Sequence, residues 1–367
     1  IIISTKLKNR NKINEKIKNS KILQIIKNWN EYYVEYEWIY NKWVKVLETT
    51  KNSIKNWVEN YVKAVQILWD SRWFLNELEK IDIEIPNLET YWKMIYKLFL
   101  NDEIKKKVNH QTENLIIKND KQEIPWEIMH NWKNFLSLKF PISRQIMTRE
   151  KKKENKIEKN KIPKILFIIN PTNNLKETEI EAENIIKKIL KKAEIKILKQ
   201  QNANLINVIW ELSKNNYDII HYSWHSFFDA EKPDEWWLVL ANQEILSNTE
   251  IKRLLWWNPL IFLNACYSWK SISDDENHYK NTWEDTIWLA SSFYIWWAKL
   301  VISSLWPIKD KKASIFATNF YLKFLGGKSV WNALIYAKRE AYIYNIKNPT
   351  WASFVYYWDP DFKINLK

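Results

Sequence analysis

The sequence has 367 residues, of which 46% are apolar and 27% charged, with one cysteine and a formal net charge of +14. No run comes near the roughly eighteen uncharged apolar residues that cross a membrane, and a single cysteine excludes an internal disulfide and favours a reducing, cytoplasmic setting. The lysines are scattered or lie in linkers, and no nucleic-acid-binding motif accompanies them. We therefore expect no nucleic acid and no membrane as partner.

The first part of the chain, residues 1–84, predicts a small N-terminal appendage of strands and helices. Short β-rich runs separated by tryptophans indicate a β-meander, with strands at 21–27, 31–37 and 44–47. Apolar residues at helical spacing follow at 58–78. Because the sequence starts with Ile1 and not with methionine, we expect it to be a fragment of a longer protein.

Residues 85–367 predict one domain with its core at 164–367. A helix is predicted over 89–100, whereas the polar segments 101–122 and 150–164 predict a mobile connection and a solvated linker. Strands are then predicted at 165–169, 194–198, 218–222, 260–263, 300–304 and 354–357. Helices are predicted between them, at 177–192, 203–214, 284–295, 313–325 and 329–344. This alternation is typical of a mainly parallel sheet covered by helices on both faces, so the expected fold class is α/β.

Two of these strand ends carry residues suited to chemistry. His225 follows the strand at 218–222, and Cys266, the only cysteine, follows the strand at 260–263. Ligands and chemistry collect at the carboxyl ends of strands in open parallel sheets, and a thiol beside an imidazole is the minimal nucleophile-and-base pair for acyl transfer. The alternative is structural, since a lone cysteine is usually a small buried hydrophobe and a lone histidine a structural residue.

Glycine and tryptophan usage is abnormal. The chain has 2 Gly and 24 Trp, whereas ordinary usage of about 7% would give roughly 25 glycines. Tryptophans also occur at turn positions that usually contain glycine, as in the segments 28–30 (N-W-N) and 131–133 (N-W-K). We expect most of them to be glycine in the natural protein, from a lineage that reads UGA as glycine. A protein with 24 true tryptophans would have to turn almost without the residue that tolerates positive φ.

Motifs in consistent order along residues 85–367 resemble those of the CHAT domain, a caspase-like domain associated with TPR repeats and related to separase and the caspases. The segment 125–136 (P-W-E-I-M-H-N-W-K-N-F-L) is similar to the family's P-W-E block. The segments 221–225 (H-Y-S-W-H) and 263–269 (L-N-A-C-Y-S-W) are similar to its H-x-x-G-H and A-C-x-S-G motifs. Further similar motifs lie at 283–290, 304–307 and 351–360. The resemblance implies a caspase-like fold of clan CD, and we expect a bacterial source.

The resemblance also separates two classes of tryptophan. One class falls where the family itself uses tryptophan: Trp126, Trp306 and Trp351. The other falls where the family uses glycine: Trp132, Trp224, Trp269, Trp283, Trp288 and Trp358. This division supports the glycine hypothesis independently of the residue counts.

By position, the resemblance implies that His225 and Cys266 form the catalytic dyad of a cysteine endopeptidase. Cys266 would attack the peptide carbonyl and form an acyl-enzyme, and His225 would transfer the protons. The backbone N–H groups of Ser226 and Cys266 would hold the oxyanion. A true tryptophan at Trp224 would crowd the cleft, so the alternative is an inactive CHAT-type interaction module.

Other residues are candidates for substrate binding. The resemblance implies that the segment from Ser304 to Trp306 lines the S1 region, with Trp224 beside it. Asp229 and Asp310 lie near strand ends and could face a basic P1 side chain; a helix cap or a solvated loop is the alternative for each. His221 is expected to be a buried, hydrogen-bonding residue.

The implied partners are a protein or peptide substrate and, further, a regulatory or TPR-containing protein. We expect no cofactor and no metal, because the sequence has neither a phosphate-binding glycine loop nor a metal-ligand cluster.

Overall fold

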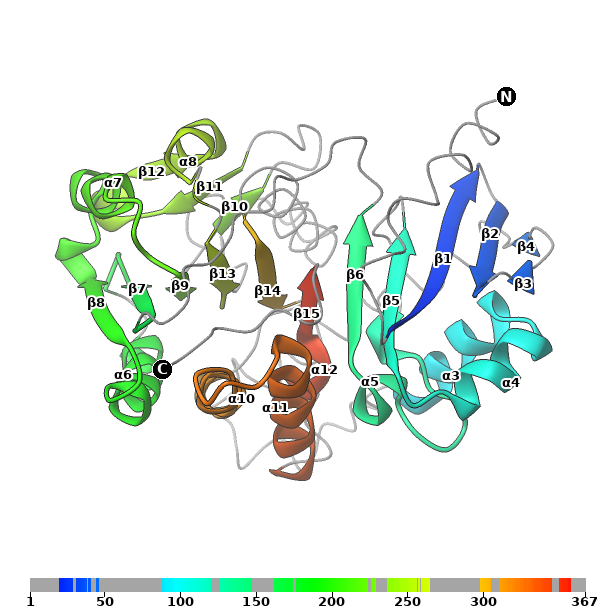
Figure 1. Ribbon diagram of the computed structural model, residues 1–367. Helices are drawn as coiled ribbons and strands as arrows, with labels where there is room; N and C mark the ends of the chain where they lie inside the picture. Colours follow the sequence, from blue (N-terminus) through cyan, green and yellow to red (C-terminus); the bar gives the residue numbers. More distant parts are fainter. Residues whose placement is uncertain are drawn as a thin grey trace, which may run out of the picture.

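The computed structural model describes residues 20–28, 31–37, 39–40, 44–45, 88–119, 126–146, 162–173, 176–223, 226–228, 236–255, 257, 259–264, 298–304, 310–344 and 350–357. Within these ranges one large sheet crosses the molecule, in the strand order β3-β2-β1-β5-β6-β15-β14-β13-β9-β7-β8 with β4 paired to β2 (Figure 1). A second, small antiparallel sheet has the order β10-β11-β12.

The strands at one end of the large sheet are parallel and carry the candidate site. They are β7 (Lys164–Ile169), β8 (Glu194–Lys199), β9 (Ile219–Ser223), β13 (Leu260–Leu263) and β14 (Leu300–Ser304). The burial of four of them is nearly complete, since every residue of β9, β13 and β14 and all but the first of β7 are buried. Such continuous apolar runs are what a parallel sheet covered on both faces requires.

Helices cover both faces of this part of the sheet (Figure 1). The helices α6 (Lys176–Ile189), α10 (Asp310–Phe324) and α11 (Val330–Tyr344) lie on one face, and α7 (Leu205–Ser213) and α8 (Asn248–Leu254) lie on the other. The chain steps from β7 to β8 at the edge and then back past β7 to β9. Right-handed crossovers in opposite directions place α6 and α7 on opposite faces. The predicted α/β class with a mainly parallel sheet is confirmed.

The other end of the sheet is built from N-terminal and C-terminal strands. These are β1 (Ser20–Asn28), β2 (Glu31–Tyr36), β3 (Ile39–Tyr40), β4 (Val44–Lys45), β5 (Asn114–Asn119), β6 (Ile142–Ile146) and β15 (Phe354–Tyr357). β15 is antiparallel to β14 but parallel to β6, and β6, β5 and β1 are parallel in turn. The predicted meander of β1, β2 and β4 is present, and β1 joins it to the large sheet through β5. The division of the chain near residue 84 stays a prediction.

The prediction of a mobile connection over 101–122 was wrong. This segment forms α4 (Asp102–His110) and β5, and β5 lies inside the sheet between β1 and β6. Asn101 caps α4 by accepting a hydrogen bond from the backbone N of Ile104 at 2.8 Å, and Ile104 and Val108 are buried one turn apart. The capping asparagine followed by acidic residues is a helix-start signal that the overall polarity of the segment masks.

The remaining described elements are short or flank the sheet. They are α3 (Leu88–Phe99), η5 (Trp126–Ile128), α5 (Leu136–Lys139), η6 (Gln200–Asn202), β10 (Ser226–Phe228), β11 (Trp236–Val239), η7 (Ala241–Gln243), β12 (Ile245–Ser247) and α12 (Thr350–Ser353). The predicted helix at 89–100 is confirmed by α3. The predicted helices at 58–78 and 284–295 lie outside the described residues.

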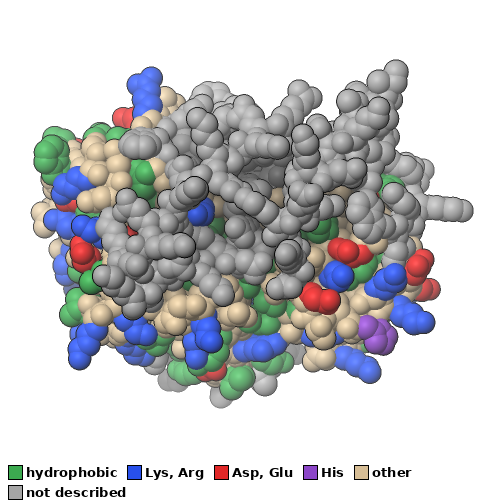
Figure 2. All heavy atoms as spheres, in the orientation of Figure 1, with side chains coloured by type: hydrophobic (Ala, Val, Ile, Leu, Met, Phe, Trp, Pro, Cys, Tyr) green, Lys and Arg blue, Asp and Glu red, His purple; other side chains and the backbone are tan. Residues whose placement is uncertain are grey.

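On the face shown in Figure 2, lysine and arginine side chains are spread over the described surface, and acidic side chains lie among them. No helix of the described residues is long and apolar enough to cross a membrane.

Candidate functional site

The two strands that lead to the proposed dyad are hydrogen-bonded neighbours. β9 and β13 run parallel, with Leu263 in register with Tyr222, and the backbone N of Asn264 donates to the carbonyl of Tyr222 at 2.9 Å. β9 ends two residues before His225, and Asn264 stands two residues before Cys266. The strand ends that precede the two residues therefore lie side by side at the carboxyl edge of the sheet, where parallel sheets bind ligands.

Most of the predicted site residues lie outside the described residues, namely Trp224, His225, Asp229, Cys266 and Trp306. The others fall at element ends. Ser226 is the first residue of β10, Ser304 is the last of β14, and Asp310 is the first of α10. Of these three, Ser304 has a described side chain, which is fully buried.

Three buried polar side chains lie at the carboxyl edge of the sheet, and we call Ser223, Asn264 and Ser304 the polar layer. Phe262 is in register with both His221 and Ile302. In-register residues of parallel strands share a face, and residues two positions apart on one strand also share it. The polar layer is therefore one row across β9, β13 and β14, on the face that α6 and α10 cover. Their exposed fractions are 0%, 5% and 0%.

Each member of the polar layer has an oxygen with no hydrogen-bond partner among the described residues. These atoms are the hydroxyl oxygens of Ser223 and Ser304 and Oδ1 of Asn264. Buried polar atoms are nearly always paired in folded proteins. The polar layer therefore provides a row of unpaired hydrogen-bonding oxygens at the carboxyl edge of the sheet.

Glu181 of α6 contacts the polar layer from the face of the sheet that α6 covers. The side-chain nitrogen of Asn264 donates to both carboxylate oxygens of Glu181, at 2.8 and 2.9 Å, and Glu181 is 2% exposed. A carboxylate accepts and does not donate, so the amide nitrogen of Asn264 must face Glu181 and its oxygen must face away. Sequence reasoning missed Glu181, although a signal was present: it lies on the buried stripe of α6, four residues before Ile185 and eight before Ile189.

His221 is a core residue, as predicted. Its ring stacks on Phe262 at a centroid distance of 4.9 Å, and its Nδ1 lies 3.1 Å from the hydroxyl of Tyr321 on α10. Burial lowers the pKa of His221 to about 3, so the ring is neutral at physiological pH. This histidine supports the sheet under the polar layer and is not available as a proton carrier.

A second hydrogen-bond network fixes the end of β7. The backbone N of Asn170 donates to the carbonyl of Ser223 at 3.2 Å, and its side-chain nitrogen donates to Glu179 at 2.6 Å. Gln200 donates to the same carboxylate at 2.8 Å. Although burial acts against it, these two hydrogen bonds and the charge of Lys199 lower the pKa of Glu179. Glu179 is therefore ionised and holds α6 to the strand end.

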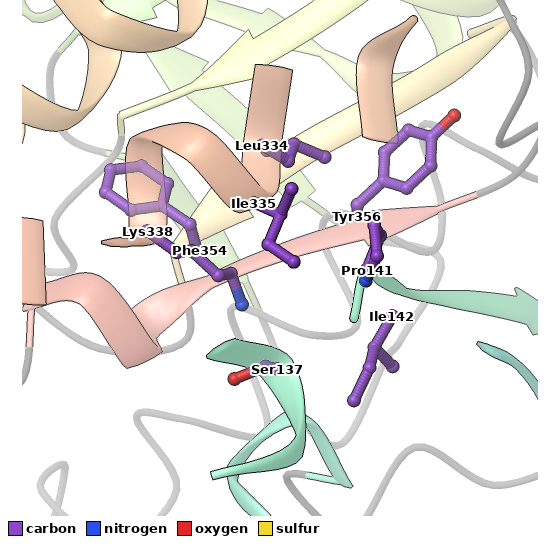
Figure 3. A pocket seen from close by; sticks show the side chains of 8 residues that line it. All are labelled: Ser137, Pro141, Ile142, Leu334, Ile335, Lys338, Phe354 and Tyr356. Carbon is purple, nitrogen blue, oxygen red and sulfur yellow. The ribbon is translucent and has the colours of Figure 1, made fainter. Parts of the chain in front are cut away.

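A small cavity lies between α5, α11, β6 and β15 (Figure 3). Its lining residues are Ser137, Pro141, Ile142, Leu334, Ile335, Lys338, Phe354 and Tyr356. Its volume of about 10 Å³ has room for one water molecule and not for a substrate. Within the described ranges no cluster of three or more histidine, cysteine or acidic residues could hold a metal ion.

Comparison with known proteins gives one family match and several distant structures. A family model described as "CHAT domain" matches residues 89–359. No curated protein matches the chain.

The similar structures include the Arg-specific cysteine proteinase gingipain R, with 11% identity, a TM-score of 0.47, and 95% of this chain and 79% of that chain covered. The complex of the pro- and mature domains of RgpB from Porphyromonas gingivalis has 11% identity and a TM-score of 0.43, with 78% and 72% covered. Saccharomyces cerevisiae separase, in its complex with securin, has 17% identity and a TM-score of 0.40. The match covers 70% of this chain but only 16% of separase.

Proposed function

Because this chain belongs to the CHAT domain family, we propose that it is a cysteine endopeptidase that uses His225 and Cys266 as its dyad. The observation that carries the proposal is the pairing of β9 with β13 up to the bond between Asn264 N and Tyr222 O. Neighbouring strands lie about 4.8 Å apart. His225 follows the end of β9 by two residues and Cys266 follows the end of β13 by three, so we expect the two side chains to come within reach of each other.

The proposed reaction forms and breaks one acyl bond to the enzyme. The Cys266 thiolate attacks the carbonyl carbon of the scissile peptide, and the oxyanion accepts hydrogen bonds from the backbone N–H groups of Ser226 and Cys266. His225 then protonates the leaving amine as the C–N bond breaks. In the second half, His225 takes a proton from water, which attacks the thioester and releases the acid and the thiol.

The proposed substrate site extends from the dyad toward β14. Ser304 and Trp306 would line the S1 region, Trp224 would flank the histidine, and Asp229 or Asp310 would face a basic P1 side chain. The parallel pairing of β14 with β13 brings Ser304 beside Asn264 and supports its place next to the nucleophile segment. A protein or peptide is the proposed substrate, a regulatory or TPR-containing protein the proposed partner, and the cytoplasm the proposed location.

The test uses the fact that the chain has one cysteine. A peptide electrophile should label the wild-type chain and fail to label Cys266→Ala, and peptide cleavage should disappear in Cys266→Ala and in His225→Ala. The loss should be at least 1,000-fold, as expected when a nucleophile or its base is removed. Cleavage that persists in Cys266→Ala would overturn the proposal.

The second candidate function is an inactive CHAT-type module that recruits partners. It is favoured by Trp224, because an indole directly before His225 would crowd the substrate cleft. An intact, labelled Cys266 without hydrolysis across a diverse peptide library would select this candidate.

We also propose that most tryptophans of this sequence, Trp224 and Trp269 among them, are glycine in the natural protein. Trp132 supports this proposal, because its φ is 70° and its side chain is 51% exposed. Trp126 and Trp351, at positions where the family uses tryptophan, are buried instead, with exposed fractions of 1% and 4%. With glycine at 224 the cleft beside His225 would be open.

A further inference from the structure

Glu181 is a buried carboxylate that the proposed dyad chemistry does not use. It lies on the apolar stripe of α6, where a leucine or an alanine would continue the pattern of Ile185 and Ile189. Burying a carboxylate costs several kcal/mol unless hydrogen bonds compensate. A glutamate at this buried position therefore lowers the stability of the fold relative to an apolar residue, which points to a role that an apolar residue could not fill.

The hydrogen bonds of Asn264 show what that role is. Its backbone N bonds to Tyr222 of the neighbouring strand, and its side-chain nitrogen bonds to both oxygens of Glu181. The residue at which the chain leaves β13 is thus held in the plane of the sheet and from the face below it. Cys266 follows two residues later.

We propose that Glu181 and Asn264 are positioning residues for the nucleophile, an inference that rests on the proposed peptidase function. Glu181 fixes the rotation of the Asn264 amide and, through Asn264, the direction in which the Cys266 segment leaves the sheet. The fixed amide directs Oδ1, which has no partner among the described residues, away from Glu181. It is flanked in the polar layer by Ser223 and Ser304. In this arrangement Oδ1 is an available acceptor at the carboxyl edge of the sheet.

The isosteric variant Glu181→Gln separates this role from simple packing. A glutamine keeps the shape but can donate as well as accept, so it no longer forces one orientation on the Asn264 amide. Asn264→Leu removes the link between α6 and the Cys266 segment. Because a displacement of about 1 Å at a reacting group can cost roughly 100-fold in rate, we expect each variant to lower kcat by roughly 10- to 100-fold with KM nearly unchanged.

The matched control is Glu211→Gln. Glu211 is also a buried glutamate of a flanking helix, 4% exposed, and accepts hydrogen bonds from Lys214 at 2.7 Å and from Tyr217. Tyr217 precedes the amino end of β9, so Glu211 acts at the opposite edge of the sheet. This control should lower Tm at least as much as Glu181→Gln and leave the rates within about twofold, as expected for a site distant from the chemistry.

The experiment measures the rate at which iodoacetamide alkylates Cys266, the kcat and KM for peptide cleavage, and Tm. Alkylation is specific because the chain has one cysteine. We expect Glu181→Gln and Asn264→Leu to slow alkylation about tenfold or more, and the double variant to be no slower than Asn264→Leu alone, since the two residues act as one unit.

Three results would overturn the positioning role: unchanged alkylation in Glu181→Gln, additive effects in the double variant, or equal losses in Glu181→Gln and Glu211→Gln. If the wild-type chain cleaves no peptide, the peptidase proposal fails, whereas the alkylation rates still decide whether Glu181 positions the thiol.

Discussion

The backbone at Trp132 is of the kind that glycine accommodates. The other described left-handed residues outside glycine carry polar side chains: Glu37, Asn170, Asn173, Gln200, Asn215, Asn242 and Gln243. Gly327, just past the end of α10, has a φ of 83°. A bulky side chain at positive φ crowds its own carbonyl and costs about 1–2 kcal/mol. Trp132 also stands between Asn131 and Lys133 in a short turn, where Asn131 accepts hydrogen bonds from the backbone of Lys133 and Asn134.

We expect Trp132→Gly to stabilise the protein by about 1 kcal/mol, because the strain is relieved at the cost of an edge contact with the Tyr96 ring at a centroid distance of 6.0 Å. Trp126→Gly is the control and should destabilise by about 3–5 kcal/mol, because Trp126 is 1% exposed and packs on Phe99 at 4.9 Å. Urea unfolding of the two variants measures both effects.

The codons of the natural gene give an independent check of the same hypothesis. UGA at 132, 224 and 269 with UGG at 126, 306 and 351 is the expected pattern. UGG at all six positions would contradict it.

Lys338 is a buried lysine whose charged form is disfavoured in the folded protein. It is 6% exposed on α11, beside a buried ion pair in which Arg144 donates to Glu127 at 2.5 and 2.6 Å. Burial lowers the pKa of Lys338 from 10.5 to about 8; the Glu127 carboxylate opposes the shift and the Arg144 guanidinium adds to it. One carboxylate thus faces two cations, and the fold makes the charged form of Lys338 less favourable than it is in the unfolded chain.

We expect Lys338→Met to stabilise the protein at pH 7, by an amount on the order of 3 kcal/mol. The unfolded chain binds the lysine proton more tightly than the folded chain. The contribution of this group to stability is therefore lowest below pH 8 and rises between pH 8 and 10.5. The advantage of the variant should shrink by about 2 kcal/mol from pH 7 to pH 9.5. Urea unfolding at both pH values tests this, and an advantage independent of pH would contradict the lowered pKa.

At the scale of elements, the sequence predicted best where burial is continuous. β7, β9, β13 and β14 are short apolar runs, and each was expected within one residue of its observed bounds. The pairing of β5 between β1 and β6 was not expected, because N-L-I-I-K-N is a brief apolar run in a polar segment. Its strand state depends on neighbours that are distant in sequence, which local propensity does not encode.

The candidate site was predictable only in part for the same reason. The two strand ends before His225 and Cys266 follow from local patterns, and parallel pairing brings them to one edge. The contact between Asn264 and Glu181 joins residues that are 83 positions apart in the sequence, and no local sequence pattern predicts it. The available signal was a charged residue on an apolar helix stripe. It points to Glu181 as unusual but does not predict which residue it contacts.

At the scale of the whole molecule, the N-terminal strands and the CHAT core share one sheet. β1 pairs in parallel with β5 over Ser20 to Ile25, and β5 pairs with β6 on its other side. The meander also contributes to the core, with Leu23, Ile25, Tyr32, Val34 and Tyr36 all buried. Tyr36 donates a hydrogen bond to Gln111 at 2.8 Å, just past the end of α4. These contacts cross the expected boundary near residue 84.

We therefore expect a chain that starts at residue 85 to be less stable and prone to association. Its β5 would become an edge strand with open backbone groups, and the apolar surface that β1 and β2 cover would meet water. A single unfolding transition of the full chain and a lower Tm of the shortened one are the expected results of calorimetry. Light scattering should detect the association. An appendage that folds by itself would instead give two transitions in the full chain and leave the Tm of residues 85–367 unchanged, because no pairing would then link the two parts.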